Sequence, residues 1–182
     1  GYFIGTCYDG RKIFDALKDK KRGEGISVQD GDTKVWEIVK EYDDDAFKAD
    51  ETSVGYAINV YQETINKYFR EYLVNFDYVI RVMENYGFKP ITNAEARHLG
   101  MPAGVGNFKQ LYDDKKYHMT PSERTISFFN NYFIFKKIRK VDAEKVKLEA
   151  TDESVAEIKL NLADTEAARK PTKKRKKKLV IQ

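Results

Sequence analysis

The sequence predicts an α/β fold with a mostly parallel sheet, an antiparallel edge strand and a β-hairpin insertion. Residues 2–23 read as a strand, a short loop and a helix, an order that is typical of α/β proteins. Residues 35–42 and 55–61 alternate as strands do, and fit an antiparallel pair with a long connection. Residues 88–92 and 131–138 read as strands with no helix of crossover length between them. We therefore expect these two to pair antiparallel at the edge of the sheet.

The strand-loop-helix unit begins with YFIGT at residues 2–6, an apolar run rich in β-forming residues. Asp9 is a residue type that caps helix N-termini. Ile13, Phe14 and Leu17 follow at helical spacing, so we expect a helix that starts after Asp9 and buries these three side chains. In α/β proteins binding sites gather at the carboxyl ends of strands, so we expect site residues just after this run.

A long helix is predicted by INKYFREYLVNFDYVIRVMENYGF, residues 65–88. Its apolar side chains recur at steps of three and four, which is the spacing of one helix face. This stripe consists of Ile65, Phe69, Leu73, Phe76, Ile80 and Met83. The predicted start falls between Ile65 and Arg70, and Gly87 fits the position just past the last turn. Residues 93–120 contain several glycines and are expected to be irregular.

Composition narrows the function classes. Cys7 is the single cysteine among 182 residues, which excludes an internal disulfide and fits a reducing compartment. Because His98 and His118 are the two histidines, the sequence also argues against a zinc site of the common types. No run of about 18 apolar residues is present, so we expect no membrane span and no membrane partner.

Charge is unevenly distributed along the chain. Residues 169–178 hold eight of the 33 Lys and Arg side chains, which leaves 25 basic against 29 acidic groups in the remainder, a net charge near −4. From about residue 141 the periodicity fades, and we predict a disordered tail over 141–182. Its basic cluster fits contact with RNA or another polyanion, and the alternatives are a nuclear targeting signal, a solubilising tail or a linker. The cluster consists of Lys173, Lys174, Arg175, Lys176, Lys177 and Lys178.

Three stretches carry a resemblance to a known family. They are GYFIGT at residues 1–6, REYLVNFDYVIRVMENYGF at 70–88 and SFFNNYFIFKKI at 127–138. They resemble the fifth strand, the E-(Y/F)-L-V helix with the strand after it, and the last strand of class I S-adenosylmethionine-dependent methyltransferases. The closer likeness is to mRNA cap guanine-N7 methyltransferases of the type found in capping enzymes of large DNA viruses. The resemblance covers residues 1–140 and implies the C-terminal half of a Rossmann-like methyltransferase sheet, with the hairpin insertion at about 26–62.

The resemblance implies an activity and a cofactor for the whole enzyme. The implied reaction transfers a methyl group from S-adenosylmethionine to guanine N7 of GpppN-capped RNA. The family's motifs for the methyl donor would lie upstream of Gly1. We therefore expect the S-adenosylmethionine site to lie largely outside this chain, and the isolated chain to be inactive.

Glu71 is the implied reader of the cap guanine. In the family, the glutamate before an aromatic-Leu-Val sequence accepts hydrogen bonds from guanine N1–H and from the exocyclic amine, and Glu71 precedes Tyr-Leu-Val here. The alternative from the residues alone is a solvated helix carboxylate that pairs with Lys67 or Arg70.

Two tyrosines are implied as the aromatic residues that flank the guanine. Tyr8 follows the first strand, where cellular relatives have a proline, and packing on the exit loop is the alternative. Tyr132 lies in the last strand, although an ungapped match would place Asn130 there instead. Tyr56 and Tyr61 of the predicted hairpin either line the pocket or pack on its face, and packing is the preferred interpretation.

The resemblance also implies partners and a location. The partners are the capped 5′ end of an mRNA, the missing N-terminal half of the domain, and other capping modules or an activating subunit. The location is the host cytoplasm, in a viral factory, or the virion, while the basic tail also fits the nucleus. The rival interpretation is a non-catalytic RNA-binding accessory subunit of a capping complex with a degenerate methyltransferase fold.

Overall fold

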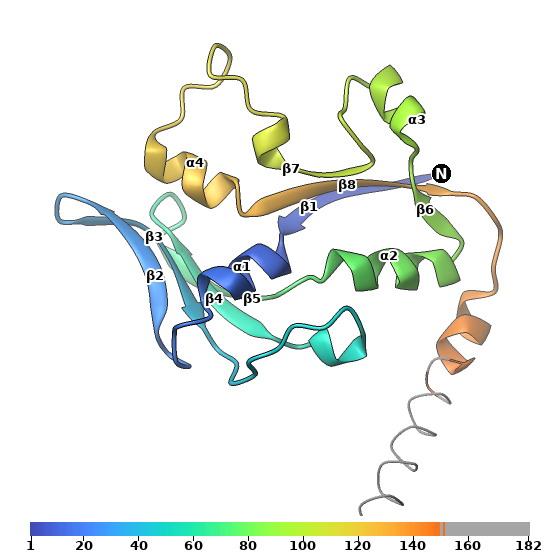
Figure 1. Ribbon diagram of the computed structural model, residues 1–182, viewed down its shortest axis with the longest axis horizontal. Coiled ribbons are helices and arrows are strands. Elements are labelled where there is room, and N and C mark those ends of the chain that lie inside the picture. Colours follow the sequence, from blue (N-terminus) through green and yellow to red (C-terminus); the bar gives the residue numbers. More distant parts are fainter. Residues whose placement is uncertain (150, 152–182) are drawn as a thin grey trace, which may run out of the picture. The chain divides into compact units, whose positions relative to one another are not determined.

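The computed structural model describes residues 1–149 and 151. The chain divides into two units, Gly1–Lys140 and Val141–Gln182. The first unit contains two antiparallel sheets of four strands each, with short helices around them (Figure 1). Within the described part of the chain, no helix combines the length and the apolar character that a membrane crossing requires.

The first sheet is built around one central strand. Its strands are β1 (Tyr2–Tyr8), β6 (Phe88–Pro90), β7 (Val105–Asn107) and β8 (Asn130–Lys137). β8 pairs along its length with β1 on one side, and with β6 and β7 on the other. Every pairing is antiparallel, so β1 and β6 run in the same direction. The expected antiparallel pairing of segments 88–92 and 131–138 is confirmed.

The prediction of a mostly parallel sheet is wrong, because both sheets are antiparallel. The chain leaves β1 through helix α1 and enters the second sheet instead of returning beside β1, so no parallel crossover forms. The partner of β1 is β8, the last strand in chain order. Along its other edge, β1 meets no strand among the described residues.

The second sheet is a meander in chain order. Its strands are β2 (Gly25–Asp30), β3 (Thr33–Lys40), β4 (Ala57–Gln62) and β5 (Lys67–Tyr72). The predicted antiparallel pair is confirmed as β3 and β4. Strands β2 and β5 extend this hairpin on both sides, so the insertion is larger than expected.

The predicted start of the long helix is wrong. Residues 67–72 form strand β5, and helix α2 (Phe76–Asn85) begins only after the cap at Asn75, whose side chain accepts a hydrogen bond from the Tyr78 amide. Apolar residues that are four apart share one face of a helix, but they also share one face of a strand. The spacing of Ile65, Phe69 and Leu73 therefore fits a strand as well as a helix. The predicted end is confirmed, since Gly87 follows the C-cap with a φ of 79°.

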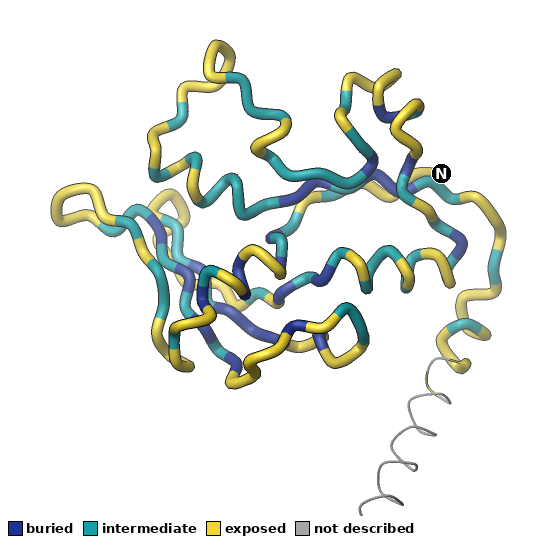
Figure 2. Tube along the Cα trace, viewed as in Figure 1, coloured by how far each residue is buried: buried dark blue, intermediate teal, exposed yellow. Residues whose placement is uncertain are grey.

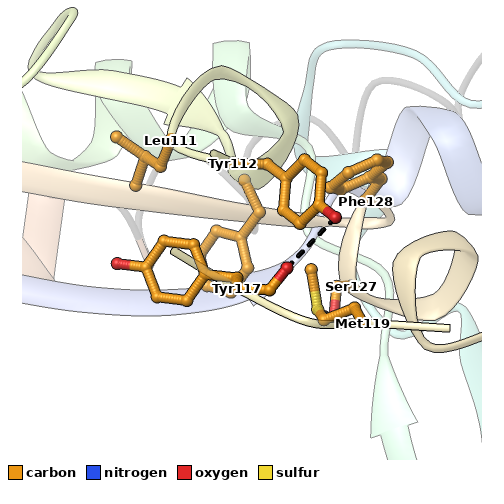
Figure 3. A pocket seen from close by; sticks show the side chains of 7 residues that line it. Leu111, Tyr112, Tyr117, Met119, Ser127 and Phe128 are labelled. Carbon is orange, nitrogen blue, oxygen red and sulfur yellow. Dashed lines mark hydrogen bonds between the residues drawn. The ribbon is translucent and has the colours of Figure 1, made fainter. Parts of the chain in front are cut away.

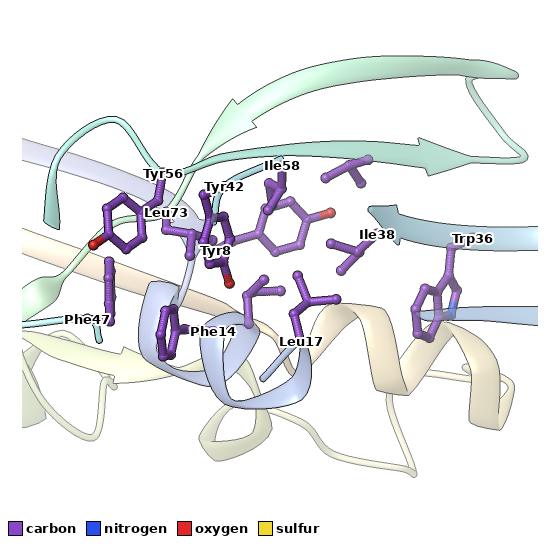
Figure 4. Close-up of a cluster of buried hydrophobic side chains, with 12 residues drawn as sticks. Tyr8, Phe14, Leu17, Trp36, Ile38, Tyr42, Phe47, Tyr56, Ile58 and Leu73 are labelled. Carbon is purple, nitrogen blue, oxygen red and sulfur yellow. The ribbon is translucent and has the colours of Figure 1, made fainter. Parts of the chain in front are cut away.

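Helix α1 (Gly10–Ala16) forms as expected. The Asp9 side chain accepts hydrogen bonds from the backbone amides of Arg11 and Lys12. The helix packs against the inner face of the second sheet in an aromatic-rich core, where buried residues concentrate (Figures 2 and 4). This core consists of Tyr8, Ile13, Phe14, Leu17, Trp36, Ile38, Tyr42, Phe47, Tyr56, Ile58, Val60 and Leu73.

Four further helical segments are described in the first unit. They are the one-turn helix η1 (Glu51–Ser53) between β3 and β4, α3 (Asn93–His98), the one-turn helix η2 (Phe108–Gln110) and α4 (Pro121–Ser127). Ile134 of β8 packs with Ile91 and Ala96 in a second, smaller core. The opposite face of the sheet contacts α2, with the Phe76 and Phe133 ring centroids 6.3 Å apart.

The predicted disordered tail begins with ordered structure. Residues 143–149 are helical in the second unit, and Lys145 lies 3.8 Å from the Glu149 carboxylate. The structure thus gives this stretch a helix, and disorder of the tail as a whole stays a prediction. The basic cluster at 173–178 lies outside the described residues.

Helix α3 is tied to β8 by one ion pair, and this gives a pH prediction. Lys136 Nζ lies 2.6 Å from a Glu95 carboxylate oxygen, and the Thr92 amide and hydroxyl donate to the other oxygen. These bonds, first that of Lys136, lower the pKa of Glu95 from 4.5 to about 2. The carboxylate therefore stabilises the fold above pH 4.5, and this contribution is lost as the pH falls from 4.5 towards 2.

We expect Glu95→Gln to lower the melting temperature at neutral pH, and the gap from wild type to shrink as the medium is acidified below pH 4.5. Thermal melts of both proteins across this range measure the gap. Glu63→Gln is the matched control, since Glu63 is exposed and has no side-chain partner among the described residues, and it should leave the melting temperature unchanged. A gap that stays constant into the acid range would contradict the assignment.

Candidate functional site

Glu71 lies on the inner face of the second sheet, at its β5 edge. It stands opposite Ile58 of β4, which in turn stands opposite Lys40 of β3, so the three side chains share the face that the core covers. The carboxylate is half-buried and has no hydrogen-bond or ion-pair partner among the described residues. Burial raises the pKa of Glu71 above its ordinary value. Neither Lys67 nor Arg70 pairs with it, and the alternative of a helix carboxylate is wrong because Glu71 is on a strand.

Tyr8 lies beside Glu71 at the carboxyl end of β1. Its ring is 6% exposed, and its hydroxyl accepts a hydrogen bond of 3.1 Å from Gln62 Nε2. Burial raises the pKa of Tyr8, and the charge of the Glu71 carboxylate raises it further. Burial, and then the charges of Asp9 and Glu71, raise the pKa of Cys7 to about 11. Glu71 therefore acts on Cys7 and Tyr8 through its charge, and Gln62 is joined to Tyr8 by a hydrogen bond. We refer to these four residues as the Glu71 cluster, although the side chains of Cys7 and Tyr8 leave β1 on opposite faces.

Tyr132 is not part of the Glu71 cluster. It stands opposite Thr6 of β1 and opposite Gly106 of β7, and it is 4% exposed. Its hydroxyl oxygen would lie only 2.4 Å from a Cβ on Gly106, so the tyrosine extends over this glycine towards β7. The hydroxyl has no hydrogen-bond partner among the described residues. Asn130, the alternative to Tyr132, donates to the Ile126 carbonyl at 3.1 Å.

An asparagine network fixes the chain where it leaves β1. Asn131 Nδ2 donates to Asp9 Oδ2 at 3.0 Å, and Asn107 Nδ2 donates to Asn131 Oδ1 at 2.9 Å. Directly after Asp9, the Gly10 amide donates to the Val74 carbonyl at 3.0 Å, which joins the exit of β1 to the segment after β5. The network therefore fixes the exit of β1, and the Gly10–Val74 bond ties that exit to the segment that follows β5. Asn107 and Asn131 were not predicted as site residues, although the adjacent asparagines at 130–131 are visible in the sequence.

The tyrosines of the predicted hairpin pack as expected. Tyr56 stacks on Tyr42 with ring centroids 5.0 Å apart, and its hydroxyl donates to the Ala46 carbonyl. Tyr61 lies 5.2 Å from the Tyr68 ring. Neither tyrosine lines the Glu71 cluster.

The arrangement suits recognition of a ligand better than bond making. A carboxylate without partners accepts two hydrogen bonds from a planar ligand edge, whereas the thiol of Cys7 stays protonated at neutral pH with a pKa of about 11. Among the described residues, no three or more His, Cys, Asp and Glu side chains gather as metal ligands would. The turn after β1 does not fit S-adenosylmethionine either, because Asp9 is used by the amides of α1 and by Asn131.

The fold is that of a mixed α/β protein with two antiparallel sheets, and the candidate site is centred on one half-buried carboxylate. No protein-family model matches the sequence, and no curated protein matches it. The resemblance to cap methyltransferases therefore depends on the residues of the chain itself.

Proposed function

We propose that residues 1–140 form the guanine-binding part of an mRNA cap guanine-N7 methyltransferase. The observation that carries this proposal is the half-buried Glu71 carboxylate without a partner, next to Tyr8. The Glu71 oxygens are not among the buried polar atoms without a partner, so water reaches them, and a guanine edge would replace that water with two donors. Side chains with burial-shifted pKa values are also concentrated at functional sites.

The free edge of β1 supports the same proposal. Tyr2, Phe3 and Ile4 are 60%, 47% and 68% exposed, although they belong to an apolar strand. An unpaired strand edge is a template for a further strand. We propose that the methyl-donor half of the domain pairs there and holds S-adenosylmethionine, outside the residues described here.

In this proposal Glu71 accepts the guanine N1–H and amine hydrogens, and Tyr8 forms the wall beside it. Tyr132, the other tyrosine expected to flank the guanine, extends over Gly106 towards β7, so we assign the wall to Tyr8 alone. Because Tyr8 is almost fully buried, we assign it the role of shaping the pocket instead of that of an open stacking surface. The substrate is GpppN-capped RNA, and binding in a fixed orientation is the contribution of this part of the enzyme.

The second candidate is a non-catalytic, RNA-binding accessory subunit of a capping complex. The poor fit of the β1 exit to S-adenosylmethionine agrees with this role, in which no donor site is required, as it agrees with a donor site on another half of the domain. Either role implies a viral factory in the host cytoplasm, or the virion.

We expect Glu71→Gln to weaken binding of the cap analogue GpppA to the full chain by at least about tenfold, since hydrogen bonds to a charged group contribute about 1.5–3 kcal/mol. Isothermal titration calorimetry with wild type and variant measures this change. Acidification should weaken binding in the same direction, because a protonated carboxyl group accepts fewer hydrogen bonds and the pKa of Glu71 is already raised.

ApppA is the ligand control, because adenine lacks the N1–H donor, and Glu63→Gln is the protein control. Equal affinity for GpppA and ApppA, or a Glu71→Gln variant that binds as wild type does, would overturn the guanine assignment. A second assay distinguishes the methyltransferase from the accessory subunit. The chain is joined to a half that binds the methyl donor, and transfer of a labelled methyl group to the cap is measured. Transfer to the cap supports the enzyme, and cap binding without transfer supports the accessory subunit.

A further inference from the structure

A cavity of about 310 Å³ lies outside the Glu71 cluster. Its lining residues belong to the segment that connects β7 to β8 along the chain, residues 108–128. Aromatic side chains dominate its wall, as Figure 3 shows. The rings are Phe108, Tyr112, Tyr117 and Phe128, and Met119 and Ser127 lie beside them. The volume is at the lower end of the range for small-ligand sites, about 300–1,000 Å³.

The aromatic wall is held in place by its own contacts. The rings of Tyr112 and Phe128 are 5.5 Å apart and meet edge to face, with an interplanar angle of 69°. The Tyr112 hydroxyl donates to the Tyr117 carbonyl at 3.2 Å, which fixes the backbone of the loop that carries Tyr117. The Tyr117 side chain is 54% exposed, so an aromatic ring is accessible at this wall.

Basic side chains lie in the same segment of the chain as these aromatic residues. Lys109, Lys115 and Lys116 are exposed, and none of them has an ion-pair partner among the described residues. The Arg124 guanidinium lies over the Tyr112 ring at 5.9 Å. The acids of this segment are Asp113, Asp114 and Glu123. The Lys115 amide donates to Asp113 and the Thr120 amide donates to Glu123, while Asp114 is exposed next to Lys115.

We propose that this cavity binds an unpaired nucleobase of an RNA strand, whose phosphates contact the lysines. Aromatic side chains stack on unpaired bases, and basic side chains that follow the backbone complete such sites. The identity of the strand as RNA rests on the proposed function. The cavity shares no residue with the Glu71 cluster, so it would hold a nucleotide other than the cap guanine.

The test is binding of two short, uncapped, fluorescent oligonucleotides to the full chain, one of adenosines and one abasic. Both carry the same phosphates, so the contribution of the basic cluster at 173–178 is the same for each. We expect wild type to bind the adenosine strand at least about fivefold more tightly, which is the lower end of the effect of stacking one base. Tyr117→Ala should remove this preference, whereas Tyr117→Phe, which keeps the ring, should retain it.

Tyr2→Ala is the matched control, because Tyr2 is a comparably exposed tyrosine, at 60%, on strand β1, whereas Tyr117 lies in a loop. It should leave the preference unchanged, and circular dichroism verifies that each variant is folded. Equal binding of both strands by wild type, or a preference that survives Tyr117→Ala, would overturn the proposal. Adenosine monophosphate that binds as tightly as the strand would overturn RNA as the source of the base. Because neither cap nor methyl donor is present, failure here leaves the GpppA result standing, and the reverse also holds.

Discussion

Phe135→Ala should lower the free energy of unfolding by about 3–5 kcal/mol, the usual cost of removing a buried phenylalanine ring. Phe135 is fully buried, at 0% exposure, and lies on the central strand β8. It stands opposite Phe3 of β1 and Pro90 of β6, and its ring lies 5.7 Å from that of Phe133. Because β8 is paired on both sides, the strand has little freedom to close the space that the ring leaves.

Urea unfolding followed by Trp36 fluorescence measures this loss, since the single tryptophan is buried at 3% exposure. Phe69→Ala on β5 is the matched control. Its ring is 46% exposed, so we expect a loss below about 1 kcal/mol. Far-UV circular dichroism on the same samples tests whether both sheets unfold together. A loss for Phe135→Ala no larger than that of the control would contradict the placement of β8 at the centre of its sheet.

The sequence was sufficient to predict helix α1 and the end of helix α2, because both depend on residues close together in the chain. Asp9 caps α1, and the three apolar residues after it are buried, because capping and helical periodicity depend only on near neighbours. Gly87 ends α2 for the same kind of reason, since a positive φ costs little at glycine.

Elements that depend on distant pairing were not predictable in this way. The segment around Phe69 became strand β5 because β4 lies beside it, with Val60 directly opposite. The first sheet is antiparallel because β1 pairs with β8. These two strands lie near opposite ends of the sequence of the first unit. The sequence of residues 2–8 contains no pattern that predicts an antiparallel partner for strand β1.

The candidate site shows the same division. The resemblance placed Glu71 and Tyr8 in one pocket, and the structure brings their side chains within electrostatic range. Tyr132 is separated from them because it extends over Gly106. That direction follows from the pairing of β7 with β8, which the irregular sequence at 93–120 did not reveal.

Trp36→Ala should also lower the free energy of unfolding by about 3–5 kcal/mol. Trp36 connects the second sheet to the α4 region. Its indole Nε1 donates to the Ser122 carbonyl at 3.0 Å, and its ring meets Phe129 edge to face at 6.3 Å. Truncation therefore removes a buried ring, an aromatic contact and a hydrogen bond at once.

Trp36→Phe separates these effects, because it keeps a ring in the core but removes the donor to Ser122. We expect it to cost about 0.5–1.5 kcal/mol, the net contribution of one hydrogen bond. Both variants lack the fluorescent residue, so urea unfolding followed by far-UV circular dichroism is the suitable measurement. Wild type, Phe and Ala should fall in that order of stability. If Trp36→Phe were as destabilising as Trp36→Ala, the hydrogen bond to Ser122 would account for the whole effect of Trp36. If Trp36→Ala lowered the free energy of unfolding by less than about 1 kcal/mol, within the range of surface substitutions, Trp36 would not join the sheet to α4.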